Sequence, residues 1–256
     1  MDGVRKAVVV LIWTNKNKPT SGYSQTTGFI YKKNDEGLFI LSTSHQFMNN
    51  IFENLLEMPK SQLGVRVEFF DRTTIMDADV LHFDMVKDLT LITVKSCDEL
   101  KTHPIDCIEP IPFSMDPPNC SQDVYTFHHP VWFNIATCKQ EVAYFQYTEG
   151  FIVYNFTQNS GVVSYYMPLI FPGSSGAPVV NKNSKRLVSM FEYQDSLRNV
   201  HAGTNAGTMS VKVYRGPTVS VIQQFLNEAE TPNPSTTESG QSGDAETDTN
   251  DVVIGC

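Results

Sequence analysis

A doubled serine between two glycines, in the stretch "LIFPGSSGAPVVN" (169–181), has the surroundings that best suit nucleophilic chemistry. The glycines permit a sharp turn that exposes the side chain of Ser175, and an apolar segment follows directly. Such a turn can also direct backbone N–H groups, here those of Gly173 and Ser175, towards a developing oxyanion. Gly-Ser turns are common in ordinary hairpins as well. Chemistry at Ser175 therefore requires a base and an orienting acid elsewhere in the chain.

Two other residues could supply these roles. His45 ends an apolar segment in "LFILSTSHQF", and Asp88 begins one in "KDLTLITV". An acid at the entrance to a buried strand is costly unless it is hydrogen-bonded, and an imidazole N–H is a suitable donor. Singly, His45 would be a surface imidazole and Asp88 a strand-end cap. Together with Ser175 they form a candidate triad, with Asp84 as a second candidate for the acid.

The elements that must position these residues are mostly short strands. Apolar runs rich in Val, Ile, Phe and Tyr recur along the chain, separated by Gly, Asn, Asp, Pro or Lys, which predicts an all-β protein. The proline-rich segment 108–122 lies between two sets of about six strands and is a connector. We therefore expect two six-stranded antiparallel β-barrels, with His45 and Asp88 in the first and Ser175 in the second.

The domain boundaries follow from this pattern. We expect an N-terminal barrel over 1–112 and a C-terminal barrel over 113–229. Apolar residues at helical spacing predict helices over 47–58 and 217–229, the second being a closing helix. Residues 230–256 are acidic and almost without apolar side chains, so a disordered tail is expected there.

These motifs resemble those of the trypsin-like, chymotrypsin-fold serine peptidases, including the HtrA-type branch. "ILSTSHQF" is similar to the family's strand-then-His motif, "DLTLITV" to its Asp-Leu-Ala-Leu-Leu motif, and "PGSSGAPVVN" to its Gly-x-Ser-Gly-Gly-Pro motif. The resemblance covers roughly residues 5 to 228. Ala177 replaces the second glycine, and the cysteines that flank the catalytic residues in secreted members are absent.

The resemblance implies a serine endopeptidase with a substrate pocket. The pocket floor lies six residues before the nucleophile, which is Leu169, and an uncharged floor favours a hydrophobic P1 residue. The remaining lining positions implied by the resemblance are Glu192, Tyr193, Gln194 and Gly207. Trypsin-type zymogens carry an Asp immediately before the nucleophile, which pairs with a new N-terminal ammonium. Ser174 has no charge for this, so activation by cleavage is not expected.

Other interpretations fit less well. An α/β-hydrolase elbow has a glycine two residues after the serine and then a helix, whereas here Ala177 and a strand follow. A viral 3C-like cysteine protease shares the two-barrel fold but needs Cys in place of Ser175. A catalytically silent homologue that binds peptides in its cleft is the serious alternative, from a different functional class.

The composition of the chain limits the kinds of partner that it can be expected to bind. Net charge is −9, but seven acids lie in 228–256, so the remainder is close to neutral and no nucleic-acid partner is expected. No apolar stretch approaches the roughly 20 residues of a membrane span. We expect protein or peptide substrates, and self-association is compatible with the resemblance.

The cysteine and histidine spacings predict no metal site and no cofactor. Five cysteines occur without a CxxC motif, which favours reduced thiols and an intracellular protein. No small-residue cleavage site follows the short apolar run that begins at Ala7, so a signal peptide is not expected. The pair His128-His129 has no third metal ligand at suitable spacing and is expected on a loop after "DVYTF".

Overall fold

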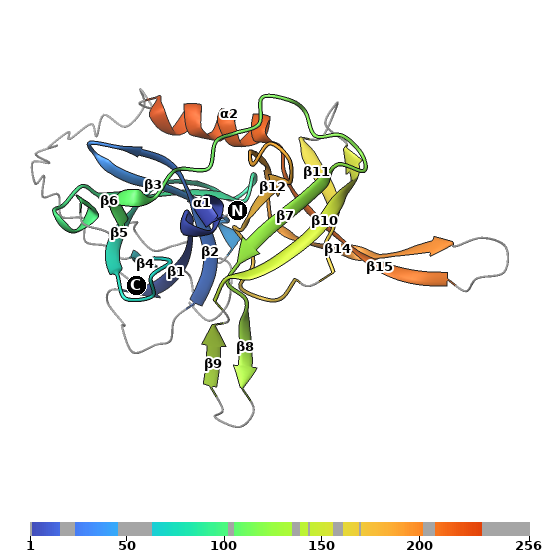
Figure 1. Cartoon of the computed structure of the whole chain (residues 1–256), viewed down its shortest axis with the longest axis horizontal. Helices are drawn as coiled ribbons and strands as arrows, with labels where there is room; N and C mark the ends of the chain where they lie inside the picture. The colour runs from blue at the N-terminus through green and yellow to red at the C-terminus, as the bar shows by residue number, and fades with distance from the viewer. Residues whose placement is uncertain are drawn as a thin grey trace, which may run out of the picture.

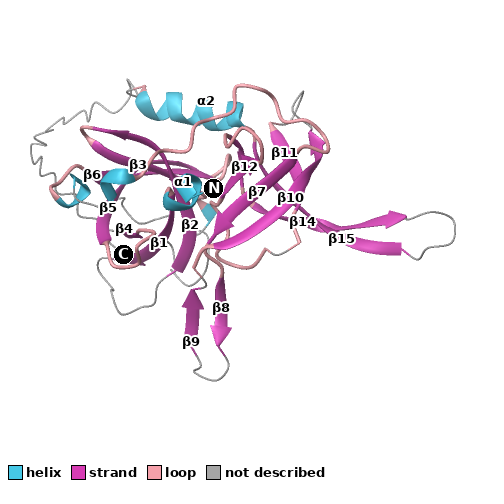
Figure 2. Ribbon diagram, viewed as in Figure 1, coloured by secondary structure: helices cyan, strands magenta, loops and turns pink. Residues whose placement is uncertain are grey.

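The protein consists almost entirely of β-strands, as Figures 1 and 2 show for this computed structural model. The structure describes residues 2–15, 24–45, 63–101, 105–134, 139–142, 144–155, 161–168, 170–201 and 208–231. The helix predicted over 47–58 and the tail beyond residue 231 lie outside these ranges. The all-β prediction is confirmed.

The first six strands form a closed antiparallel barrel in the order β1-β2-β3-β6-β5-β4. The sequence of β1, Val8–Asn15, explains its place: residues 8–13 are all buried, because this strand has the barrel core on one side and further packed structure on the other. The remaining bounds are Ser24–Asn34 (β2), Gly37–Ser42 (β3), Leu63–Glu68 (β4), Ile75–Asp84 (β5) and Leu89–Lys95 (β6).

The second barrel uses strands from the later part of the chain. Its sheet has the order β13-β12-β7-β10-β11-β15-β14. An antiparallel bridge between Ser189 and Thr218 brings β13 back to the end of β15, so six strands close and β14 continues outward as a hairpin with β15. The bounds are Asp123–His128 (β7), Gln146–Asn155 (β10), Val162–Tyr166 (β11), Pro178–Asn181 (β12), Leu187–Met190 (β13), Tyr193–His201 (β14) and Thr208–Pro217 (β15).

Two hairpins project from this barrel in Figure 1. One is the end of β14 and β15. The other pairs β8, Val131–Asn134, with β9, Lys139–Val142, in a separate two-stranded sheet. The β8–β9 hairpin matters for the site, because the segment that leads into it contacts the turn that carries Ser175.

The closing helix α2, Val219–Glu230, begins two residues later than predicted. Pro217 ends β15, where it pairs with Val162, and Thr218 is the N-cap whose hydroxyl accepts from the Val221 N–H. The helix buries Ile222, Phe225 and Leu226 in the cluster that forms the core of the first barrel.

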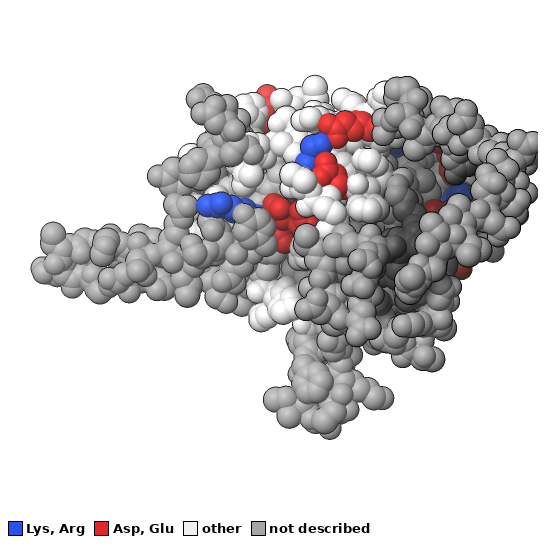
Figure 3. Space-filling model, turned by 180° about the vertical axis from the view of Figure 1, so that it is seen from behind, with Lys and Arg blue, Asp and Glu red and all other residues white. Residues whose placement is uncertain are grey.

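Ion pairs add to this packing: Lys87 Nζ lies 2.5 Å from Glu228 Oε2, and Lys32 Nζ lies 3.3 Å from Glu230 Oε1. Figure 3 shows basic side chains next to acidic ones on the described part of the opposite face.

A short helix, α1 (Asp2–Lys6), precedes β1, and 3-10 turns occur at Glu99–Lys101 and Ile105–Cys107. From there to β7 the chain contains no named strand, and its one isolated bridge joins Phe113 to Leu187. This agrees with a connector. The boundary between residues 112 and 113 stays a prediction. No helix in the described ranges has the length and apolar character to cross a membrane.

Candidate active site

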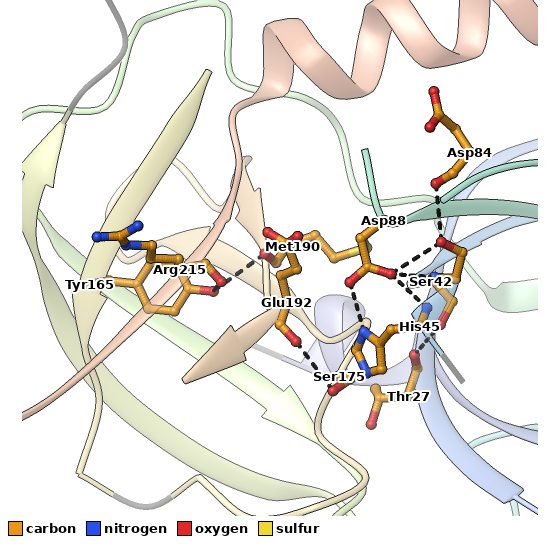
Figure 4. Close-up of polar contacts among 11 residues, drawn as sticks. Thr27, Ser42, His45, Asp84, Asp88, Tyr165, Ser175, Met190, Glu192 and Arg215 are labelled. Atoms are coloured by element: carbon orange, nitrogen blue, oxygen red, sulfur yellow. Dashed lines mark hydrogen bonds and ion pairs between the residues drawn. The ribbon is translucent and has the colours of Figure 1, made fainter. Parts of the chain in front are cut away.

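Asp88 holds His45 through both the ring and the backbone (Figure 4). The Nδ1 atom of His45 lies 2.7 Å from Oδ2 of Asp88. The other carboxylate oxygen accepts the N–H groups of Ser44, at 2.8 Å, and His45, at 2.6 Å. Because His45 lies three residues after the end of β3, these bonds fix both the chain there and the imidazole plane. Nε2 is left as the ring nitrogen that does not face the acid.

Asp84 shapes the turn that delivers Asp88. Its Oδ1 accepts the N–H groups of Val86 and Lys87 at 2.8 and 2.9 Å, and its Oδ2 lies 3.1 Å from Lys87 Nζ. Burial raises the pKa of Asp84, but these hydrogen bonds and the Lys87 charge outweigh it and lower the pKa. Asp88 follows with a φ of +52°, a left-handed conformation that Asp tolerates better than most residues. The two acids therefore have different partners. Asp84 accepts hydrogen bonds from the turn, and Asp88 is hydrogen-bonded to His45.

The Ser175 turn needs glycine on both sides. Gly173 and Gly176 both have a φ of +87°. A Cβ on Gly173 would lie 2.7 Å from a methyl carbon of Val131, and a Cβ on Gly176 would lie 2.0 Å from the carbonyl oxygen of Thr27. Ala177, by contrast, is fully buried without conflict. Its methyl group in place of the expected glycine is therefore accommodated.

The same turn is seated on the first barrel. Thr27 N–H donates to Ser175 O at 3.0 Å, and Ser42 Oγ donates to Thr27 O at 2.8 Å. Ser42 is the last residue of β3, three residues before His45. The contact between barrels therefore brings the nucleophile candidate to the strand end that carries the base candidate.

The Ser175 hydroxyl is directed at a backbone carbonyl. Its Oγ donates to Glu192 O at 3.4 Å, and Figure 4 draws the Ser175 side chain between Glu192 and the His45 ring. The His45 side chain is 34% exposed, so the ring is open on one side. The three residues expected from the sequence thus lie in one region, with the His45–Asp88 bond formed and the serine hydroxyl bonded elsewhere.

The directions of the Gly173 and Ser175 N–H groups follow from the carbonyl groups in the same peptide planes. Val131 N–H donates to Pro172 O at 2.7 Å, and Ala177 N–H donates to Ser174 O at 3.0 Å. In a trans peptide the N–H points opposite to the C=O, so the N–H groups of Gly173 and Ser175 point away from these donors. Neither has an acceptor among the described residues. They are available to an oxyanion.

Of the expected pocket residues, Glu192 is the one whose side chain the structure describes. Burial is the main cause that raises the pKa of its carboxyl to about 7; Asp88 raises it further, while His45 and Arg215 lower it. Tyr193 and Gln194 begin β14, paired with Arg215 and Tyr214. The side chains of Tyr193 and Gln194, and all of Leu169 and Gly207, lie outside the described residues.

The expectation of a loop at His128-His129 is wrong for His128, while His129 lies outside any strand or helix. His128 is the last residue of β7, and both histidines are almost fully buried. His128 Nδ1 lies 2.7 Å from Ser174 Oγ, and its Nε2 lies 3.2 Å from Thr148 Oγ1. A sequence signal was present: Pro130 marks the end of an apolar strand that continues through His128.

Comparison with known proteins adds family information. Residues 26–190, more than half of the chain, match the family model of the trypsin-like peptidase domain. No curated protein sequence matches the chain.

Similar solved structures include a serine endoprotease from Yersinia pestis, with a TM-score of 0.55 and 15% identity over 89% of this chain and 64% of that one. The active form of Rv3671c protease from M. tuberculosis gives a TM-score of 0.56 and 13% identity over 91% and 85%. An inactive mutant form of Rv3671c gives 0.55 and 13% over 91% and 92%. This chain therefore spans less than two thirds of the Yersinia protein, and at these identities the likeness concerns the fold.

Proposed function

Since the chain belongs to the trypsin-like peptidase family, we propose that it is a serine endopeptidase and that His45, Asp88 and Ser175 form its catalytic triad. The observation that carries the proposal is the 2.7 Å contact between His45 Nδ1 and Asp88 Oδ2, beside a glycine turn that presents Ser175. The proposal assigns the base and the acid to the barrel within 1–112 and the nucleophile to the barrel within 113–229.

The chemistry follows from these positions. A rotation about the Cα–Cβ bond takes the Ser175 hydroxyl from Glu192 O towards His45 Nε2, which removes its proton as Oγ attacks the substrate carbonyl carbon. Asp88 stays ionised, fixes the tautomer and stabilises the imidazolium. The N–H groups of Gly173 and Ser175 bind the oxyanion.

Collapse of the tetrahedral intermediate breaks the C–N bond, and the His45 imidazolium gives its proton to the leaving amine. Ser175 then carries the acyl group. Water, deprotonated by His45, attacks this ester and releases the second product. The reaction regenerates the free serine and uses no metal or cofactor.

The preferred substrate is a protein segment with a hydrophobic P1 residue. This part of the proposal is supported by the uncharged Leu169 at the family's pocket-floor position. Glu192 does not oppose it below neutral pH, since its raised pKa keeps much of the carboxyl uncharged there. A P1-diverse peptide library tests it, and dominant cleavage after Arg or Lys would contradict it.

We also propose a cellular compartment and a class of partner for the enzyme. Cys97 and Cys120 are free thiols, which supports a reducing, intracellular compartment. Protein substrates follow from the family. Self-association stays a prediction, as does the absence of a nucleic-acid partner.

Labelling with a fluorophosphonate tests the triad directly. The wild-type chain should be labelled, Ser175→Ala should not, and His45→Ala should react far more slowly. Ser184→Ala is the matched control, because Ser184 lies exposed on the turn after β12. Absence of labelling in correctly folded wild-type protein would favour a silent homologue that only binds peptides.

A further inference from the structure

Consecutive groups of the Ser175 turn are held by one short segment, residues 128–131. Val131 N–H binds the Pro172 carbonyl at 2.7 Å. His129 N–H donates to Thr27 Oγ1 at 3.0 Å, and that hydroxyl donates to Gly173 O at 2.9 Å. The next group along the turn is the Ser174 hydroxyl, which contacts the His128 ring.

The His128–Ser174 contact is fully enclosed. Both residues are 0% exposed, and both ring nitrogens of His128 are in contact with hydroxyls, Ser174 Oγ at 2.7 Å and Thr148 Oγ1 at 3.2 Å. A neutral imidazole has one donor and one acceptor nitrogen, and a hydroxyl can serve either, so both tautomers satisfy the ring. Burial lowers the pKa of His128 to about 4, which keeps the ring uncharged at neutral pH.

Ser174 lies between Gly173 and Ser175, whose N–H groups the proposed function assigns to the oxyanion. Its own N–H donates to Phe171 O at 3.2 Å, and its carbonyl accepts from Ala177 at 3.0 Å. The side chain of Ser174 is therefore the part of this residue that the backbone hydrogen bonds leave free to rotate. Its hydroxyl is held by the contact with His128. The two peptides that flank Ser174, the second of which carries the Ser175 N–H, therefore cannot rotate without breaking a hydrogen bond of this buried serine. The Gly173 N–H belongs to the preceding peptide, which Val131 holds through Pro172 O.

We propose that His128 is a positioning residue, which holds Ser174 so that the N–H groups of Gly173 and Ser175 stay directed at the oxyanion. The proposal rests on the proposed function of Ser175. A buried imidazole that is hydrogen-bonded to a hydroxyl orders this turn without any charged group. The residue before the nucleophile, Ser174, bears no charge that could do so. Order at the turn then requires no new N-terminus.

Two amide substitutions separate the roles of the two ring nitrogens. The Asn side chain ends near the Nδ1 position, so His128→Asn can keep the bond to Ser174. The Gln side chain reaches the Nε2 position, so His128→Gln can bond Thr148 but not Ser174. Both variants place a polar amide at the same buried site, and a general loss of stability would affect both.

We expect His128→Gln and Ser174→Ala to lower kcat about 10- to 100-fold with KM nearly unchanged, because oxyanion contacts form only in the transition state. His128→Asn should retain kcat to within about threefold. The double variant His128→Gln/Ser174→Ala should lose no more than either single variant, since both remove one bond. Ser189→Ala, which removes a buried serine bond to Pro217 O in the same barrel, is the control for destabilisation.

Amide NMR of the same proteins gives a readout independent of turnover. The N–H resonances of Gly173 and Ser175 should shift or broaden in His128→Gln and Ser174→Ala, and stay in place in His128→Asn and Ser189→Ala. Unchanged resonances and unchanged kcat in His128→Gln would overturn the positioning role. A third outcome is that the resonances are perturbed in His128→Gln and Ser174→Ala, but fluorophosphonates do not label the wild-type chain. This outcome would support the positioning role and refute the proposed function.

Discussion

His45 lies three residues after the apolar strand β3, and His128 is the last residue of the apolar strand β7. Both contact a partner from a distant part of the chain. Their surroundings differ. The His45 side chain is 34% exposed and contacts a carboxylate, whereas His128 is fully buried and contacts two hydroxyls. A carboxylate stabilises the imidazolium that proton transfer requires. Hydroxyls without a charge favour a permanently neutral ring. The same residue type can therefore exchange a proton at one position and only hold a turn at the other.

The largest expected effect concerns the charged partner of His45. Asp88→Asn should lower kcat/KM by about four orders of magnitude, because the amide N–H₂ favours the wrong imidazole tautomer. Asp84→Asn is the matched control: its amide oxygen can still accept the N–H groups of Val86 and Lys87. We expect this variant to lose less than about tenfold in peptide hydrolysis.

An equal loss in Asp84→Asn and Asp88→Asn would show that the turn, not the bond to His45, is what matters. The contrast between a histidine that contacts a carboxylate and one that contacts hydroxyls would then not explain the role of His45.

The next effect concerns the contact that joins the two regions. Gly176→Ala should lower the free energy of unfolding by more than about 2 kcal/mol, because alanine at a φ of +87° is strained and its Cβ would lie 2.0 Å from Thr27 O. Peptide hydrolysis should fall with it, since Ser175 is seated on β2 through this contact.

Gly3→Ala is the control for Gly176→Ala, because a Cβ at Gly3 meets no atom within 4 Å. Urea denaturation of both variants measures the difference. Equal stabilities would mean that the turn can leave the first barrel at little cost, and the two histidine regions would then not be mechanically connected.

The residues that carry motifs could be selected from the sequence alone, and their catalytic roles stay a prediction. His45, Asp88 and Ser175 each adjoin an apolar strand or a glycine turn, and local patterns of this kind place strands and turns in an all-β chain. The two barrels followed from the same pattern, with the proline-rich segment between them.

The supporting residues could not be found this way. Ser174 is 46 residues from His128, and nothing in "FHHP" indicates which hydroxyl the imidazole meets. Thr27 lies inside an ordinary strand pattern, and its hydroxyl joins His129 to Gly173 only because the two barrels pack there. Such contacts depend on tertiary packing, which local spacing does not encode. The choice between Asp84 and Asp88 was open for the same reason.

The smallest effect is a pair of opposed pH dependences of stability. His128 has a pKa of about 4 in the folded protein and about 6.5 when unfolded, so between these values the unfolded chain binds more protons and stability rises with pH. Glu192 has a folded pKa of about 7 against about 4.5 when unfolded. In that window the folded protein binds more protons, and stability falls as pH rises.

The two slopes therefore oppose one another between pH 4.5 and 6.5, each up to about 1.4 kcal/mol per pH unit. Glu192→Gln should make stability rise more steeply with pH across this range, because it removes the falling contribution. His128→Asn should make the rise shallower, and His129, whose pKa burial also lowers, to about 3, supplies what remains of it. Chemical denaturation at half-unit pH steps measures all three proteins. If Glu192→Gln leaves the wild-type slope unchanged, the Glu192 carboxyl is already ionised at pH 5, and the region around His45 carries one more negative charge than a raised pKa of Glu192 implies.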